Sequence, residues 1–262
     1  MAIKGSLSPS ALSSLKECEK CFWLDRHGVK KPRGIVASLP SGLDEITKDA
    51  LDNYRMKGQL PPEIAAQIPG AKAFTDLVKL NQWRTLGRGI HAKVDDTPVM
   101  GLLDDLLLFE DGTASPFDYK SRKSPPPEGY AEKYYQLQVN IYHLLLEANG
   151  FRMNGNGYFA FYSPKAITAS KETERVAVID FDVTVMKVKT NADDARAFVR
   201  RAVAVIAGPL PESGASCDTC AYVRTRGQRM TEIARAAKEA AAAKAQAEQS
   251  TAAAAAPAGG TN

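Results

Sequence analysis

The spacing of hydrophobic and polar positions changes along the chain and separates the expected strands from the expected helices. Short apolar and β-branched runs cover residues 88–95, 99–109 and 114–121. The first two runs are separated by Asp96-Thr97-Pro98 and the last two by Asp111-Gly112. Because an Asp-Gly dipeptide between two apolar runs favours a tight β-hairpin, we expect the last two strands to pair antiparallel.

Helical spacing is found on both sides of these strands. It is most regular from Ala131 to Asn149, where aromatic and aliphatic residues recur on one face and Gly150 follows, a common residue just past a helix. The other predicted elements are helices at 8–18, Leu43–Arg55 and Ala192–Ile206, and strands at Gly157–Ser163 and Arg175–Val185. This order predicts an α/β fold with a central mixed sheet flanked by helices.

The length of 262 residues allows one sizeable core, and we expect a single domain over residues 1–227. From Gln228 the sequence becomes charged and alanine-rich, which predicts a helix, and it then changes to Ala, Pro, Gly and Thr. Residues 228–262 are therefore predicted to form an appended helix and tail, with disorder over the last dozen residues.

The formal net charge of +4 permits a nucleic-acid partner without requiring one. No apolar run approaches the length of a membrane span, and residues 1–5 lack the charged and apolar regions of a signal peptide. We expect a cytoplasmic protein with no membrane partner.

The predicted hairpin carries the candidate catalytic chemistry. Asp118 and Lys120 are two apart on a strand and should project from the same face, and pairing through the Asp-Gly turn should place Asp104 beside Asp118. Two carboxylates can hold Mg²⁺, which would polarise a phosphate and acidify a water, and the lysine would orient that water. The alternative is a salt bridge on a solvated strand face.

The succession Gly-x-x-Asp (residues 101–104), Asp-x-Lys (118–120) and Gln-x-x-x-Tyr (138–142) resembles the RecB-like branch of the PD-(D/E)XK nucleases. The match covers about residues 100–145 closely. It implies a restriction-endonuclease-like core that uses Mg²⁺ or Mn²⁺. By this resemblance the metal ligands are Asp104, Asp118 and the main-chain carbonyl of Tyr119, the catalytic lysine is Lys120, and the supporting helix residues are Gln138 and Tyr142.

Many RecB-like enzymes have a further histidine ligand ahead of the hairpin, and residues 42–45 contain none. Asp44 is a candidate substitute, although an acid in the first turn of a helix also interacts favourably with the helix dipole. His91 on a predicted strand is a second candidate, with a structural role as the alternative. Strand alternation predicts that Asp105 faces away from Asp104.

Four cysteines form two C-x-x-C pairs, Cys18/Cys21 and Cys217/Cys220, near opposite ends of the chain. Four thiolates fit tetrahedral Zn²⁺ or an iron-sulfur cluster and would join the two ends; four free thiols are the alternative. The resemblance favours [4Fe-4S], which relatives such as AddB and the CRISPR-adaptation exonucleases hold between their ends. Glu19 stands where they have proline, and their cysteines divide one and three, so Zn²⁺ stays open.

Three functions remain as hypotheses. The first is a metal-dependent deoxyribonuclease, exonuclease-like on DNA ends or single strands, with Arg122 and Lys123 as the best candidate phosphate contacts. The second is a non-catalytic module of the same fold that binds DNA or a helicase-type, DNA-processing partner. The third is a zinc-stapled adaptor that does not bind nucleic acid.

Overall fold

The computed structural model describes residues 5–32, 34, 38–171 and 176–254. The chain divides into two compact units, Met1–Pro211 and Glu212–Asn262, and each is described by itself. The domain boundary expected at residue 227 stays a prediction.

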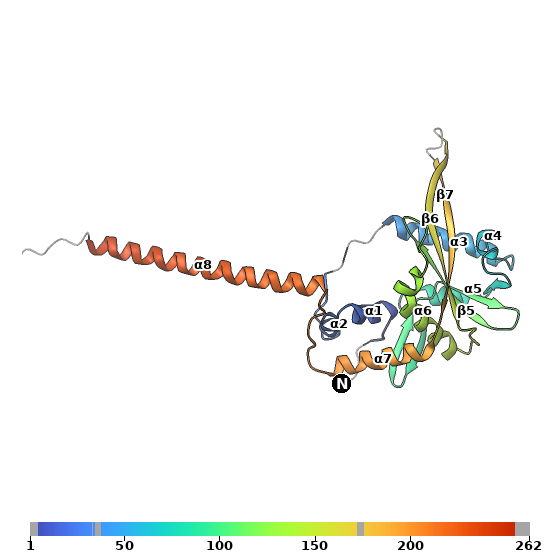
Figure 1. Cartoon of the computed structure of the whole chain (residues 1–262), viewed down its shortest axis with the longest axis horizontal. Coiled ribbons are helices and arrows are strands. Elements are labelled where there is room, and N and C mark those ends of the chain that lie inside the picture. The colour runs from blue at the N-terminus through green and yellow to red at the C-terminus, as the bar shows by residue number, and fades with distance from the viewer. Residues whose placement is uncertain (1–4, 33, 35–37, 172–175, 255–262) are drawn as a thin grey trace, which may run out of the picture. The chain divides into compact units, whose positions relative to one another are not determined.

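The first unit contains a mixed five-stranded sheet (Figure 1). Strands β5 and β6 run parallel, and the other neighbouring pairs are antiparallel. The strand order is β1 (Ala71–Ala73), β4 (Asp105–Phe109), β5 (Ala114–Ser121), β6 (Asn156–Lys171) and β7 (Val176–Lys189). The parallel pair is connected by helix α6 (Tyr130–Ala148), as a parallel crossover requires.

Helices cover both faces of this sheet because β4, β5 and β6 are apolar on both sides. On one face, α6 packs with α1 (Pro9–Glu17) and α7 (Ala192–Ala207). On the other face, α3 (Ser38–Arg55) and α4 (Pro62–Ala65) pack against Leu107, Phe117 and Tyr119. The predicted fold class, a mixed sheet flanked by helices, is confirmed.

A second, two-stranded sheet corrects one prediction. The run 99–109 was expected to be one strand, but it divides into β3 (Thr97–Gly101), which pairs with β2 (Ile90–Val94), and β4, which belongs to the main sheet. Residues 102–104 connect the two sheets, so Asp104 lies just before β4 instead of within a strand.

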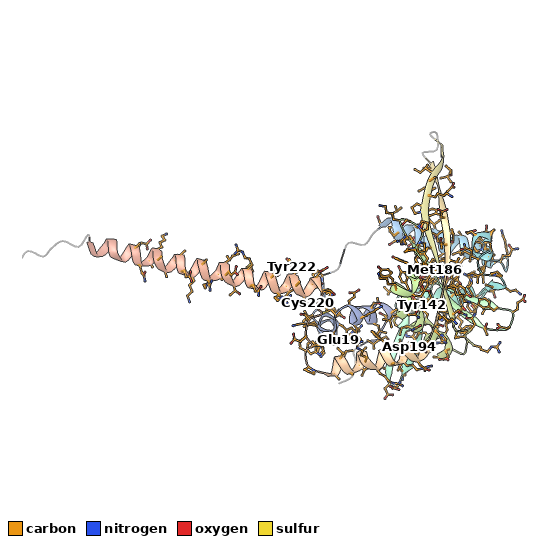
Figure 2. All side chains as sticks on the ribbon, in the orientation of Figure 1. Glu19, Tyr142, Met186, Asp194, Cys220 and Tyr222 are labelled. Carbon is orange, nitrogen blue, oxygen red and sulfur yellow. The ribbon has the colours of Figure 1, made fainter. Side chains whose placement is uncertain are left out.

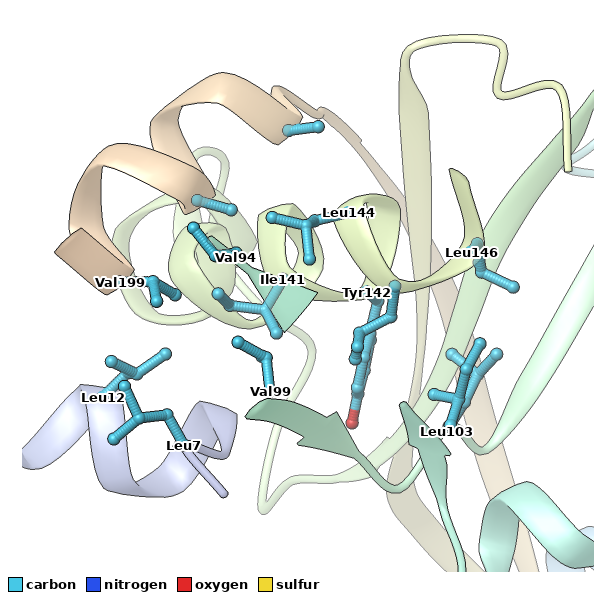
Figure 3. Close-up of a cluster of buried hydrophobic side chains, with 14 of the residues drawn as sticks. Leu7, Leu12, Val94, Val99, Leu103, Ile141, Tyr142, Leu144, Leu146 and Val199 are labelled. Atoms are coloured by element: carbon cyan, nitrogen blue, oxygen red, sulfur yellow. The ribbon is translucent and has the colours of Figure 1, made fainter. Parts of the chain in front are cut away.

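The close approach of Tyr142 explains this break. A Cβ atom at Gly101 would lie 2.9 Å from a ring carbon of Tyr142, so only glycine fits there. The Tyr142 hydroxyl donates a 2.5 Å hydrogen bond to the carbonyl of Leu102, which is thereby unavailable to a ladder. Figure 3 shows the ring extending from α6 toward the chain between Val99 and Leu103.

Most other elements lie where the pattern predicts them. Strand β5 has the predicted bounds, and α6 and α7 differ from prediction by one residue at their ends. The long hairpin of β6 and β7 extends beyond both predicted strands (Figure 1), and Arg175, the predicted first residue of the second strand, lies outside the described residues. Helix α3 begins at Ser38, earlier than predicted, and the remaining helices of the unit are α2 (Glu19–Arg26) and α5 (Leu77–Arg84).

The second unit contains α8 (Asp218–Ala254), which begins before the predicted start at Gln228. Figure 2 shows its side chains as sticks along the helix, and those of residues 221–248 are exposed. The helix continues into the first part of the segment expected to be disordered, and residues 255–262 lie outside the described part of the chain. Among the described residues, the helices are too short or too polar to cross a membrane.

Candidate active site

Asp118 is a buried carboxylate in the middle of the sheet. It lies on β5, and its neighbours Phe117 and Tyr119 point to the opposite face, toward α3 and α4. The Oδ1 atom of Asp118 accepts a 2.8 Å hydrogen bond from Nε2 of Gln138 on α6. The same amide donates to the hydroxyl of Tyr142 at 3.0 Å, so α6 fixes both the carboxylate and the connection between β3 and β4.

Lys120 lies on the same face of β5, two residues further on. Its Nζ forms an ion pair with Asp118 Oδ2 and stands 5.2 Å from the ring centroid of Tyr135. Burial acts to lower the pKa of Lys120, but the Asp118 carboxylate, with a contribution from Asp104, more than offsets it and raises that pKa. The side chain is therefore an ammonium at neutral pH.

The second oxygen of Asp118 is less well satisfied than the first. Although Lys120 lies close to Oδ2, this buried atom accepts no hydrogen bond of ordinary geometry from the residues that the structure describes. Burial, together with the negative charge of Asp104, raises the pKa of Asp118 to about 7 despite the nearby Lys120. Buried acceptors are rarely left in this state, so the position favours an additional positive ligand.

Asp104 lies directly before β4 and contacts a lysine that the sequence patterns did not identify. Nζ of Lys48, on α3, forms ion pairs with Asp104 Oδ1 at 2.8 Å and with Asp44 Oδ2 at 2.7 Å. Burial acts to lower the pKa of Lys48, but the carboxylates of Asp104 and Asp44 more than offset this effect and raise that pKa. The main-chain carbonyl of Asp104 accepts a 2.7 Å hydrogen bond from Nε of Arg84.

The neighbouring Asp105 belongs to a different cluster on the α3 face of the sheet. Its Oδ2 forms an ion pair with Arg55 and accepts a hydrogen bond from the Tyr119 hydroxyl, and all three side chains are buried. Arg84 lies 3.8 Å from the same oxygen. Asp104 and Asp105 are engaged by different side chains of α3, Lys48 and Arg55.

Two cavities adjoin the acidic pair and its lysine. One, of about 170 Å³, is lined by residues of α3 and β5 that include Asp44, Thr47 and Lys120. The other, of about 540 Å³, is lined by Tyr135, Gln138 and Tyr142 together with serines at the start of α1. Each cavity is thus lined by a residue of the candidate site, Lys120 in the first and Gln138 in the second.

A family model of the PD-(D/E)XK nuclease superfamily matches residues 38–225, which include the acids, lysines and helix residues of the candidate site. The chain belongs to the PD-(D/E)XK nuclease superfamily. This confirms the superfamily predicted from the hairpin motifs, while membership of the RecB-like branch stays a prediction.

Solved structures give more distant similarities to this PD-(D/E)XK protein. SSO0001 has a TM-score of 0.38 and 13% identity, with 78% of each chain covered. A protein named "Putative exonuclease" from Eubacterium rectale has a TM-score of 0.43 and 15% identity, with 83% of this chain and 87% of that chain covered. Both TM-scores are too low to bear on function. Curated protein sequences give no significant match.

The donor set of the superfamily site fits a divalent cation. Hard cations such as Mg²⁺ and Mn²⁺ prefer oxygen ligands, and Asp118 Oδ2 is a buried oxygen without an ordinary hydrogen bond among the described residues. The residues that the sequence predicts to hold the ion are Asp104, Asp118 and the carbonyl of Tyr119. Of the weaker candidates, Asp44 contacts Lys48, whereas His91 is exposed on β2 and contacts the carbonyl of Arg88.

The cysteine pairs lie at helix starts. Cys18 separates α1 from α2, where Cys21 follows, and both are buried; Cys217 and Cys220, at the beginning of α8, are half-buried. Each C-x-x-C pair offers two thiolates that could bind a metal.

Proposed function

We propose that this protein is a metal-dependent deoxyribonuclease that hydrolyses phosphodiester bonds, with exonuclease-like action on DNA ends or single strands. The observation that carries the proposal is the buried Asp118 carboxylate, whose Oδ2 atom lies beside an ammonium group yet has no ordinary hydrogen bond from the described residues. Such a carboxylate is costly for the fold and useful for holding a cation.

The side chains around Asp118 have separate tasks in this reaction. A Mg²⁺ or Mn²⁺ ion, when bound, would polarise the phosphate and lower the pKa of a water. Lys120 is protonated and would donate a hydrogen bond that orients the attacking water and offsets the negative charge that develops on the phosphate. Gln138 and Tyr142 act as positioning residues, because their hydrogen bonds orient Asp118 and the chain next to Asp104.

A cationic and aromatic surface near Lys120 supports a nucleic-acid substrate. The Arg122 guanidinium stands 4.6 Å from the ring centroid of Tyr130 and donates to the Pro125 carbonyl at 2.8 Å, which orders the loop after β5. Lys123 is exposed, and so is Tyr134, which packs 4.6 Å from Tyr130. Exposed aromatic rings beside cations are typical of single-strand binding, where bases stack and phosphates pair with charge.

The test is cleavage of labelled DNA by the full chain with Mg²⁺, Mn²⁺ or EDTA. Linear single strands, linear duplexes and circular single strands should be compared, because an exonuclease needs an end. We expect metal-dependent cleavage of the linear strands, loss of cleavage in Lys120→Ala, and wild-type activity in Lys72→Ala, which changes an exposed lysine on β1. Equal activity in Lys120→Ala and wild type contradicts the proposal, and salt-dependent DNA binding without cleavage supports the non-catalytic module instead.

For the four cysteines we propose a [4Fe-4S] cluster, with Zn²⁺ as the alternative. Two C-x-x-C pairs supply the four thiolates that either metal group requires. Brown protein with absorbance near roughly 400 nm and stoichiometric iron and sulfide supports the cluster. Colourless protein with stoichiometric zinc contradicts it. A helicase-type partner and a cytoplasmic location stay predictions from the sequence.

A further inference from the structure

Both candidate metal ligands are already engaged by side chains, and Asp118 is engaged at both oxygens because its Oδ2 forms an ion pair with Lys120. Asp118 Oδ1 accepts a 2.8 Å hydrogen bond from Gln138, and Asp104 Oδ1 forms a 2.8 Å ion pair with Lys48. Within the described part of the chain, Asp118 Oδ2 and Asp104 Oδ2 accept no ordinary hydrogen bond. The two acids therefore offer few unengaged oxygens to cations, which is a poor donor set for two ions.

Lys48 is held firmly in this arrangement. It contacts a second carboxylate, Asp44, at 2.7 Å, and its side chain is only 20% exposed. Two ion pairs from one partly buried ammonium restrict the side chain far more than a single surface pair would. Lys48 thus provides a fixed positive charge beside the Oδ1 atom of Asp104.

The balance of charges at the site also favours a single bound cation. Lys48 pairs with Asp44 and Asp104, Lys120 pairs with Asp118, and the charge of Asp104 acts on both Asp118 and Lys120, so three carboxylates and two ammonium groups influence one another. One divalent cation would leave these groups with a single positive charge, which a phosphodiester with its single negative charge would neutralise. A second divalent cation would add two uncompensated positive charges in a partly buried site, which is costly.

We propose that Lys48 supplies at Asp104 the charge that a second divalent cation would otherwise supply, so that the site takes one Mg²⁺ or Mn²⁺ ion per chain. This inference rests on the proposed function and assigns to Lys48 a role beyond the motif residues. Lys48 is a positioning residue by this account, since it acts through Asp104 and through the field at the bound phosphate.

The experiment is Mn²⁺ binding to the full chain, measured by calorimetry and by electron paramagnetic resonance, without substrate. The Mn²⁺ that binds to the Asp104→Asn/Asp118→Asn double variant is subtracted, which removes any contribution of the cysteines. We expect one ion in wild type, in Lys48→Arg and in Lys57→Met, an exposed lysine just after α3. Lys48→Met should bind a second ion and show the broadened signal of two neighbouring Mn²⁺ ions.

The outcomes separate the inference from the proposed function. Two ions in wild type, or one ion in Lys48→Met, overturn the role of Lys48 while leaving the nuclease proposal intact. No difference between wild type and the double variant contradicts the metal site itself. Circular dichroism of each variant confirms that the fold is retained before binding is compared.

Discussion

The two faces of the sheet near the beginning of β4 each hold a buried carboxylate, but the two carboxylates differ in how completely their oxygens are satisfied. On the α3 face, Asp105 is surrounded by Arg55, Arg84 and the Tyr119 hydroxyl. On the α6 face, Asp118 keeps a buried oxygen without an ordinary hydrogen bond from the described residues. A satisfied carboxylate serves the fold, whereas an unsatisfied one indicates a ligand.

The difference predicts opposite effects of substitution on activity and on stability. Asp118→Asn should show the largest effect, a loss of roughly 10³-fold or more in DNA cleavage, because removing a preorganised charge at a reacting phosphate commonly costs about 10²–10³ in rate and the metal ligand is lost as well. The measurement is the single-turnover rate on a labelled strand. A loss below tenfold contradicts the assignment.

On the other face, Arg55→Met should cost stability. The substitution leaves Asp105 as a buried carboxylate without its nearest counter-charge, and breaking a buried pair in this way typically costs about 3–5 kcal/mol. Chemical unfolding of the metal-free protein measures the change, and Lys72→Met, at an exposed ion pair, is the control. A change of less than about 1 kcal/mol, as expected for surface pairs, contradicts the comparison.

Whereas Arg55 stabilises the fold, the buried Asp118 carboxylate should destabilise the metal-free protein. Its pKa is raised to about 7 from 3.8, mainly by burial, so the folded state holds a proton that the unfolded state has released between these values. The free energy of unfolding therefore falls as the pH rises from about 4 to 7, by an amount on the order of a few kcal/mol. Asp118→Asn removes this fall and is more stable than wild type at pH 8 in EDTA. Parallel pH profiles for the two proteins contradict the prediction.

The smallest expected effect is that of Gly101→Ala. A Cβ atom there meets the ring of Tyr142 at 2.9 Å, and such overpacking typically costs about 1–3 kcal/mol. Because Tyr142 and Gln138 share a hydrogen bond that leads to Asp118, cleavage should also slow. Ser163→Ala, at a buried residue on the adjacent β6, provides a control for a small core change. Unchanged cleavage in Gly101→Ala would contradict the positioning role of Tyr142.

The sequence predicts the α6 face better than the α3 face, and the reason is local. Asp118, Lys120, Gln138 and Tyr142 lie on two consecutive elements whose periodicities are clear, so their faces follow from spacing alone. Lys48 and Arg55 reach the hairpin from α3, about fifty residues away in sequence, and no periodic pattern relates a helix to a distant strand. Asp44 and Lys48 are spaced i,i+4 on α3, and this spacing gives no sign of the contact between Lys48 and Asp104.

The break between β3 and β4 was missed for a similar reason. The apolar run 99–109 is continuous in sequence, and only the approach of Tyr142 to Gly101 and Leu102 separates it into two sheets. The consequence matters for the site, because Asp104 gains the freedom of a connecting residue. Its carboxylate can then contact Lys48 instead of lying in strand register.

The most direct test of the account is a crystal structure of the full chain soaked with Mn²⁺, with the ion located by its anomalous scattering. The account predicts one Mn²⁺ peak shared by the carboxylates of Asp104 and Asp118, with Lys120 beside it and Lys48 retained at Asp104. An ion held elsewhere, or no ion at these two carboxylates, would contradict it.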